Sequence, residues 1–177
     1  MSIYAVKPGW WNTPVHREEK IWIGVALVWC IAITLIMPVW HVVGDQNSSQ
    51  EYYRISGDNY AALTDAFIEQ YKVGEVQGIA VVAPPPGSDI FLRGAQWQWD
   101  PILKLTQGAT YRLHLGSVDM VHAISIFPIN INFEVVPGYD YVLTITPTSA
   151  GEFRVICNEF CGIGHHGMIG KLIVDPA

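Results

Sequence analysis

The chain has 177 residues, enough for one domain of ordinary size with appendages. Hydrophobic residues make up 50% of it and charged residues only 15%, a skew that indicates a membrane segment rather than an unusually apolar core. The formal net charge is −6, and no nucleic-acid partner is expected.

One uninterrupted apolar stretch accounts for the skew. Residues 21–43 contain no Asp, Glu, Lys or Arg, and these 23 residues exceed the roughly 20 that cross a bilayer as a helix. The alternatives are a buried core helix and a cleaved signal peptide, whose apolar region has only about 7–15 residues and ends at a small-residue cleavage site. We therefore expect one retained transmembrane helix over residues 21–43, embedded in the lipid bilayer.

The cations that flank this stretch indicate its orientation. Lys7, Arg17 and Lys20 precede it, whereas the first cation that follows it is Arg54. Because short segments rich in Lys and Arg stay in the cytoplasm, residues 1–20 are interpreted as a cytoplasmic N-terminal segment. Everything after the helix then lies on the extracytoplasmic, periplasmic side of the cell membrane.

Residues 44–88 are interpreted as a linker. The part over 44–58 is polar and typical of a connection that leaves a membrane. A short helix follows, with Asp58 or Asn59 as its cap. The residues expected on its apolar side are Ala62, Phe67, Ile68 and Tyr71. The proline run within 83–87 forms a stiff connector to the rest of the chain.

From Asp89 onward, short β-rich runs alternate with turn signals. About seven strands at regular spacing predict a β-sandwich or Greek-key barrel over residues 89–177. The expected strands lie near residues 90–99, 110–116, 121–127, 131–136, 140–146, 152–157 and 170–174. His114 falls between two leucines of one such strand and is interpreted as a structural residue.

The loop before the last expected strand gathers soft metal ligands. In its sequence, C-N-E-F-C-G-I-G-H-H-G-M, Cys157 and Cys161 offer thiolates, His165 an imidazole and Met168 a thioether. Thiolate with imidazole suits zinc or copper. The thioether favours copper, because zinc sites use Cys, His and carboxylate ligands.

The second cysteine, four positions after the first, indicates more than one metal ion. A mononuclear blue-copper site needs one cysteine, two histidines and a weak methionine. Two thiolates that each bridge two metals would use both cysteines, and each metal would then need a terminal ligand besides His165 and Met168. His122, just ahead of an alternating apolar strand, and the backbone carbonyl of Glu159 can complete that set.

With these ligands in place, the chain resembles subunit II of the haem-copper oxidases (cytochrome c oxidase). The loop matches the CuA motif C-x-E/Q-x-C-x3-H-x2-M of that family. The supporting matches are D-M-V-H at 119–122, N-F-E-V-V-P-G at 132–138 and Q-W-Q-W at 96–99. The resemblance covers residues 89–177, and the single membrane helix is similar to the layout of the compact ba-type oxidases.

The resemblance implies a mainly β, cupredoxin-like Greek-key sandwich or barrel with one N-terminal transmembrane helix. It also implies a binuclear copper centre, CuA, in which Cys157 and Cys161 bridge both metals. In the family's pattern, His122 and Met168 would complete one copper. His165 and the carbonyl of Glu159 would complete the other.

The family assigns roles to three more positions. Trp97, the first tryptophan of Q-W-x-W, would receive electrons from cytochrome c, with Gln98 in place of the family's usual aromatic residue. Glu159 carries a carboxylate that helps to bind magnesium in the larger oxidases, at the interface with subunit I. Asp119, three residues before His122, would brace that ligand or the partner chain by hydrogen bonding.

Simpler interpretations of the loop stay open at this point. Cys157 and Cys161 can form a disulfide in an oxidising compartment, as an off-state of the empty site. A zinc site leaves Met168 without a role. Of the two adjacent histidines, the motif register selects His165 and leaves His166 at the surface.

By resemblance, the chain is the electron-transfer subunit of an enzyme whose dioxygen chemistry resides in a partner. A soluble donor such as cytochrome c would reduce CuA, and the electron would pass to haem in subunit I, where dioxygen is reduced to water. The leading alternative is the small subunit of a CuA-containing nitric oxide reductase. A third hypothesis is a membrane-anchored cupredoxin that carries electrons without belonging to an enzyme.

Overall fold

The structure is a computed structural model, and it describes residues 5–44, 51–129 and 131–177. The described residues fall into two compact units, one that extends to Gly44 and one that starts at Glu51. The first unit consists of one long helix and a short 3₁₀ turn, and the second is a β-sandwich with its own core.

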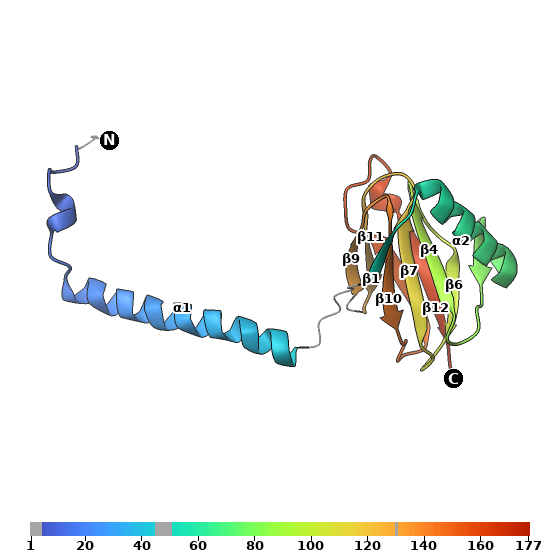
Figure 1. Ribbon diagram of the computed structural model, residues 1–177, viewed down its shortest axis with the longest axis horizontal. Coiled ribbons are helices and arrows are strands. Elements are labelled where there is room, and N and C mark those ends of the chain that lie inside the picture. The colour runs from blue at the N-terminus through green and yellow to red at the C-terminus, as the bar shows by residue number, and fades with distance from the viewer. Residues whose placement is uncertain (1–4, 45–50, 130) are drawn as a thin grey trace. The chain divides into compact units, whose positions relative to one another are not determined.

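The N-terminal unit contains the long helix α1, Arg17–Val43, after a single 3₁₀ turn at Trp10–Asn12 (Figure 1). The helix starts after His16, whose backbone N–H donates to Glu19 Oε2 at 2.9 Å. Its 27 residues, at about 1.5 Å each, extend for about 40 Å, more than the ~30 Å of bilayer hydrocarbon. Within the described part of the chain, α1 is the one helix long and apolar enough to cross a membrane, and none of its side chains is buried. It contains the whole predicted segment 21–43.

The second unit is a sandwich of two sheets. Sheet A has the strand order β1-β10-β7-β4-β5, and sheet B has the order β2-β3-β6-β12-β11-β8-β9. The strands of sheet A are β1 Glu51–Arg54, β4 Asp89–Ala95, β5 Gln98–Asp100, β7 Tyr111–Ser117 and β10 Tyr139–Ile145. The strands of sheet B are β2 Lys72–Val76, β3 Ile79–Val82, β6 Ile102–Thr106, β8 His122–Phe127, β9 Ile131–Val135, β11 Gly151–Cys157 and β12 Ile169–Asp175. The chain passes between the sheets repeatedly, from β7 to β8, from β9 to β10 and from β10 to β11, as in Greek-key folds.

The core lies between the two sheets and follows the two-residue period of the strands. In β4, Ile90 and Leu92 are buried, and they pair across the sheet with Leu113 and Leu115 of β7. The buried apolar residues that complete the core from sheet B include Leu103, Leu105, Ile124, Ile126, Val155, Leu172 and Val174. This apolar contact between the sheets is the main favourable term that holds the sandwich together.

The expected fold class is confirmed: the chain is mainly β, with one N-terminal apolar helix. Two details of the strand prediction are wrong. The strand expected near 90–99 is two strands, β4 and β5, and β6 was not expected at all. Its five residues lie between two turn signals, and its pairing with β12, far along the chain, is what makes them a strand.

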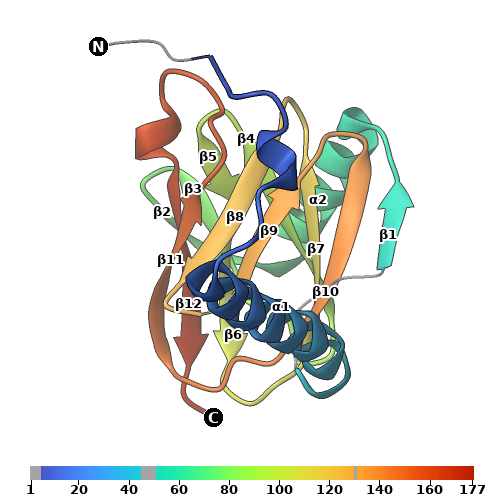
Figure 2. The same ribbon diagram turned by 90° about the vertical axis from the view of Figure 1, so that its left-hand side faces the viewer.

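The structure also differs from the expected linker over residues 44–88. Residues 45–50 lie outside the described ranges, but β1, β2 and β3 belong to the two sheets. Figure 2 shows β1 beside β10, its antiparallel partner at one edge of sheet A. Strand β3 pairs with β6 in sheet B, and Val82 is fully buried in the core. The sandwich therefore starts at Glu51, not at Asp89, because all three strands pair within its sheets and β3 also buries Val81 and Val82.

The helix expected in this region is α2, Gly57–Tyr71, and it lies along sheet A beside β4 and β7 (Figure 1). Its cap is Ser56, whose Oγ accepts a hydrogen bond from the N–H of Asn59 at 3.3 Å. Neither Asp58 nor Asn59 is the cap. The residues that α2 buries are Tyr60, Thr64 and Phe67, a stripe with helical spacing. Of the four residues expected on its apolar side, Phe67 is buried, Ile68 and Tyr71 are partly buried against the core, and Ala62 is exposed.

Tyr60 fixes α2 on the sheet. Its hydroxyl lies 3.1 Å from the carbonyl oxygen of Leu92 and 3.0 Å from that of His114, on neighbouring strands. Its ring lies over Gly116, where a Cβ atom would come within 2.5 Å of the ring. The glycine is therefore required by the close approach of the tyrosine.

We expect Gly116→Ala to lower the free energy of unfolding by about 1–3 kcal/mol, the usual cost of overpacking a filled site. Gly74→Ala is the matched control, because a Cβ atom at Gly74 meets nothing within 4 Å. The measurement is urea unfolding of the full chain in detergent, followed by tryptophan fluorescence. Equal stability of the two variants would contradict the packing of Tyr60 on Gly116.

His114 has the structural role expected of it, in an ion-pair network on the side of sheet A that faces α2. Its Nδ1 lies 2.7 Å from Asp140 Oδ2, and its Nε2 lies 3.3 Å from Asp89 Oδ1. The ring of Phe91 stacks on it at 4.5 Å. Burial acts to lower the pKa of His114, but the hydrogen bond and charge of Asp140, followed by those of Asp89, outweigh it and raise this pKa above its usual value.

This shift predicts how stability depends on pH. A histidine whose pKa is higher in the folded than in the unfolded chain stabilises fully below its unfolded pKa, about 6.5, and loses that contribution as pH rises through its folded pKa. We therefore expect the difference in unfolding free energy between the parent chain and His114→Gln to be largest below pH 6 and to shrink towards pH 9. Urea unfolding at several pH values measures it. A difference that grows with pH would contradict the raised pKa.

Candidate metal centre

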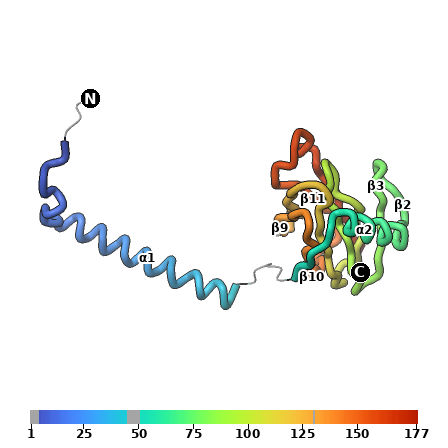
Figure 3. Tube along the Cα trace, turned by 45° about the horizontal axis from the view of Figure 1, so that its top comes forward, coloured from blue at the N-terminus to red at the C-terminus, as the bar shows by residue number. Residues whose placement is uncertain are grey.

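The predicted ligand residues come together at one end of the sandwich. His122 is the first residue of β8, Cys157 is the last residue of β11, and residues 158–168 form the loop that leads into β12. Figure 3 shows this loop as the extended segment at the tip of the second unit. Two strands of sheet B, β11 and β12, thus hold the ends of the loop, and β8 of the same sheet places His122 beside it.

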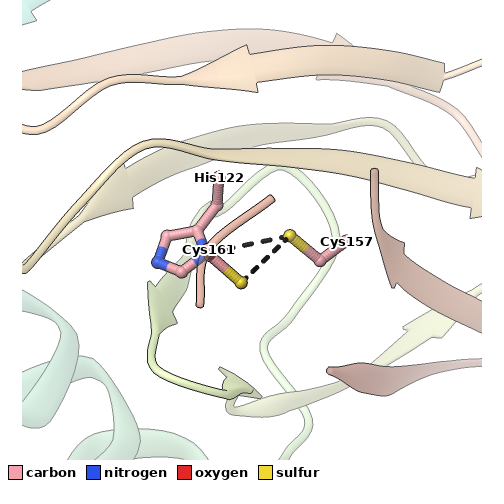
Figure 4. A group of neighbouring side chains, drawn as sticks. All are labelled: His122, Cys157 and Cys161. Atoms are coloured by element: carbon pink, nitrogen blue, oxygen red, sulfur yellow. Dashed lines mark hydrogen bonds between the residues drawn. The ribbon is translucent and has the colours of Figure 1, made fainter. Parts of the chain in front are cut away.

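The two cysteines and His122 form a compact cluster (Figure 4). Their ligand atoms all lie within 4.8 Å of one another. Cys157 Sγ lies 3.8 Å from Cys161 Sγ and 3.8 Å from His122 Nδ1. The cysteines are free thiols at this separation, with no disulfide between them.

The three other predicted donors border the same sulfurs. Cys161 Sγ lies 3.5 Å from His165 Nδ1 and 3.6 Å from Met168 Sδ. Cys157 Sγ lies 3.3 Å from the carbonyl oxygen of Glu159. The structure therefore brings together all six donor atoms that the motif predicts, within contact of two neighbouring sulfurs. His166, the histidine that the motif register leaves out, is exposed.

Most of this cluster is shielded from water. Cys161 and His122 are completely buried, and Met168 is 1% exposed. Burial raises the pKa of the Cys161 thiol to about 11, with a further contribution from the neighbouring Cys157. A dry pocket of thiol, imidazole and thioether groups suits a soft metal such as copper and offers little to a hard cation.

Backbone hydrogen bonds hold the loop closed. The N–H of Cys157 donates to the carbonyl of Met168 at 3.1 Å, across the two ends of the loop. The N–H of Asn158 donates to the carbonyl of Ala123 at 2.8 Å, which ties the loop to β8. The N–H of Met168 donates to the carbonyl of His165 in a short 3₁₀ turn. These bonds set the positions of the ligands before any metal binds.

Asp119 fixes the orientation of His122, as expected from its position. Its Oδ1 lies 2.8 Å from His122 Nε2, so that Nδ1 faces the sulfurs. Partial burial opposes ionisation of Asp119, but the hydrogen bond of His122 and the backbone N–H groups of Gln96 and Met120 outweigh it and hold the pKa of Asp119 below its usual value. An ionised carboxylate behind an imidazole keeps the ring in the tautomer that can bind a metal through Nδ1.

Trp97 lies between the cluster and the surface. Its ring is 44% exposed, and its indole N–H donates to the carbonyl of Cys161 at 3.0 Å. Trp99, two residues on, is buried, and its ring packs edge-on against His122 at 5.9 Å. Trp97 is therefore a surface residue and Trp99 a core residue, although the two stand in the same short motif.

The magnesium prediction gains no geometric support. The Glu159 side chain is exposed, and Asp119 is already held by His122 and two backbone N–H groups. Among the residues that the structure describes, the cluster of His122, Cys157 and Cys161 is the one close group of three or more His, Cys, Asp or Glu ligands. A magnesium ion stays a prediction that depends on ligands from another chain.

Sequence reasoning assigned Trp97 to the site but missed the contacts that its neighbour Gln96 and the loop glycines make there. The side chain of Gln96 donates to the carbonyl of Cys161 at 2.8 Å, although 65 residues separate the two. Gly164 leaves room for Trp97, since a Cβ atom there would lie 2.3 Å from the ring. The Q-W-Q-W motif and the loop glycines were visible in the sequence, but nothing in it showed that they meet.

Two curated relatives of this chain are cytochrome c oxidase subunits. No family model matches the chain. A cytochrome c oxidase subunit 2 from Thermus thermophilus is 38% identical over 78 residues, which cover 44% of this chain and 57% of that protein. A probable cytochrome c oxidase subunit 2 from Streptomyces coelicolor is 29% identical over 155 residues, which cover 87% of this chain and 44% of that protein. The chain thus spans about half the length of these curated relatives.

A solved structure extends the likeness to the fold. One chain of a heme-copper terminal oxidase dimer, determined by cryo-EM, superimposes with a TM-score of 0.55 at 24% identity. The match covers 90% of this chain and 100% of that chain. With the two-sheet topology, this likeness supports the cupredoxin-like fold class predicted from the sequence.

Proposed function

We propose that this chain, a homologue of cytochrome c oxidase subunit 2, is the electron-accepting subunit of a membrane haem-copper terminal oxidase. The observation that carries the proposal is a pair of cysteine sulfurs 3.8 Å apart, bordered by two imidazoles, a thioether and a backbone carbonyl. A mononuclear site has no use for the second sulfur, whereas a site with two bridging thiolates uses both. The cofactor that fits these donors is binuclear copper, CuA.

The residues present have the ligand types that such a centre needs. Cys157 and Cys161 would bridge the metals, His122 and Met168 would complete one copper, and His165 and the Glu159 carbonyl the other. When bound, a binuclear copper centre takes up and gives back one electron. The chain supplies a dry pocket and ligands held by backbone hydrogen bonds, so that little has to move when the charge changes.

Trp97 is the residue through which we expect electrons to arrive. Its exposed edge is available to a soluble donor such as cytochrome c. Its indole N–H reaches the carbonyl of Cys161, whose sulfur belongs to the cluster. One hydrogen bond and one residue therefore connect the surface to a ligand, a short route through bonded atoms.

The membrane places the chain beside its partner. In the proposed arrangement, α1 spans the lipid bilayer of the cell membrane once, with Lys7, Arg17 and Lys20 on the cytoplasmic side. The sandwich then lies on the periplasmic side, where a soluble cytochrome can reach it. Subunit I would receive the electron at haem and reduce dioxygen to water, and a magnesium ion at the interface would need ligands from that subunit.

The test is to isolate the intact complex through a tag on this chain and to supply reduced cytochrome c. Dioxygen and nitric oxide consumption are followed separately, and copper is counted per chain. We expect rapid dioxygen uptake, little loss of nitric oxide, and two copper ions on this chain beyond those of the partner. Nitric oxide consumption in place of dioxygen uptake would move the chain to a nitric oxide reductase. Purification without any haem subunit would indicate a free-standing electron carrier.

A further inference from the structure

The turn between β4 and β5 holds one side chain that contacts both the ligand loop and the segment that precedes β8. Gln96 lies at this turn, and the nitrogen of its side-chain amide makes two contacts. It lies 2.8 Å from the carbonyl oxygen of Cys161 and 2.9 Å from Met120 Sδ. An amide nitrogen has two hydrogens, so both can be used in these contacts. A glutamine at the surface normally binds water instead.

The backbone of Gln96 makes the second connection. Its N–H donates to Asp119 Oδ2 at 2.7 Å. The other oxygen of Asp119 is the one that holds His122 Nε2. Through its backbone Gln96 therefore fixes the histidine ligand on β8, and through its side chain it fixes the loop that carries Cys161.

The loop is shaped to receive this side chain. Gly162 has a backbone φ of +107°, and a Cβ atom there would lie 3.1 Å from the amide nitrogen of Gln96. The indole N–H of Trp97 donates to the same Cys161 carbonyl at 3.0 Å. One carbonyl thus accepts hydrogen bonds from two consecutive residues, so Gln96 and Trp97 are anchored at the same point of the loop.

We propose that Gln96 is a positioning residue, which keeps His122, Cys161 and Trp97 in a fixed mutual arrangement and so keeps electron transfer to the cluster fast. This inference rests on the proposed function, because it gives a role to a residue behind that site. The chemistry required is donation: two N–H groups towards a carbonyl oxygen and a thioether sulfur. A side chain of the same size without N–H groups should not keep these three residues in that arrangement.

The experiment compares Gln96→Glu and Gln96→Met with Gln98→Glu in the full chain. Gln96→Glu keeps the shape but replaces the donors by a carboxylate, and Gln96→Met keeps the length without charge or donors. Gln98→Glu is the matched control, because Gln98 is exposed two residues away and has no side-chain hydrogen bond among the described residues. It reports the effect of the added charge alone.

Two measurements separate positioning from general damage. In the metal-free chain, hydrogen exchange of the Trp97 indole N–H, assigned by its loss in Trp97→Phe, should be about fivefold faster in both Gln96 variants, as expected for one lost hydrogen bond. In the copper-loaded chain, both variants should keep the copper content but alter the paramagnetic resonance spectrum of the copper. Reduction by cytochrome c should slow about tenfold, which is within the range for a residue behind a ligand. Gln98→Glu should change neither.

The outcomes are distinguishable. If the Gln96 variants match the parent chain in exchange, spectrum and rate, Gln96 does not position the site, and the proposed function stands. If the parent chain binds no copper, the proposed function fails, while indole exchange in the metal-free chain still tests the contact of Gln96. If Gln96→Glu does not fold, Gln96→Met decides the same question without an added charge.

Discussion

Replacing Cys161 by serine is expected to abolish the proposed binuclear copper centre. Cys161 Sγ contacts Cys157, His165 and Met168, so its loss removes the atom around which three other donors are placed. A serine hydroxyl is a harder and weaker ligand for copper than a thiolate. We expect copper on this chain to fall from two ions to one or none, and electron transfer from cytochrome c to fall by more than about 100-fold, since even residues behind a ligand are worth about 10–100-fold.

The chain offers a matched control for this substitution. Cys30 is exposed on α1, remote in sequence from the cluster, and Cys30→Ser makes the same chemical change. It should keep copper content, spectrum and rate unchanged. Copper analysis and paramagnetic resonance of the purified full chain measure the result. If Cys161→Ser retained two copper ions with a shared electron, the bridging role of this sulfur would be refuted.

Replacing Gly164 by alanine should slow electron transfer while the copper remains. The backbone at Gly164, with φ of −86° and ψ of 3°, accepts an alanine. The new Cβ atom would lie 2.3 Å from the ring of Trp97, so the ring must move and its hydrogen bond to the Cys161 carbonyl must break. Because a displacement of about 1 Å can cost about 100-fold, we expect reduction by cytochrome c to slow by about 10- to 100-fold.

Gly167→Ala is the control, three residues along the same loop. A Cβ atom at Gly167 meets nothing within 4 Å, so this variant should reduce at the parent rate. Stopped-flow mixing with reduced cytochrome c measures the rate, and the copper spectrum shows whether the site is intact. Should Gly164→Ala lose copper, Trp97→Ala tests the same residue without crowding the loop. An unchanged rate in Trp97→Ala with a normal spectrum would exclude Trp97 from the route.

The ligand set was accessible to sequence reasoning because most of it is local. Cys157, Cys161, His165 and Met168 lie within one turn-rich segment of twelve positions, and their chemical types alone favour copper. His122 and the Glu159 carbonyl came into the set because two bridged metals each need a further terminal ligand, and the family resemblance then matched the same six positions. The long helix was equally accessible, since the absence of charge over residues 21–43 is a property of composition and length.

What surrounds the ligands was decided by contacts between distant parts of the chain. Gln96 meets Cys161 across 65 residues, and Tyr60 meets the carbonyl of His114 across 54. The sheet positions of β1, β3 and β6 likewise depend on partners elsewhere in the sequence. Short segments of this kind have weak local preferences, and burial against a partner determines their structure.

The sequence by itself thus determined which atoms are offered to a metal and that one helix is apolar enough to cross a membrane. Only the tertiary structure decided that the chain from Glu51 belongs to the sandwich and that the β4–β5 turn supports the ligand loop. It also separated Trp97, at the surface, from Trp99, in the core. The physical reason is the separation along the sequence of the residues that interact. Ligand chemistry and helix hydropathy are set by neighbouring residues, whereas packing and hydrogen bonding between strands depend on which distant residues the fold brings together.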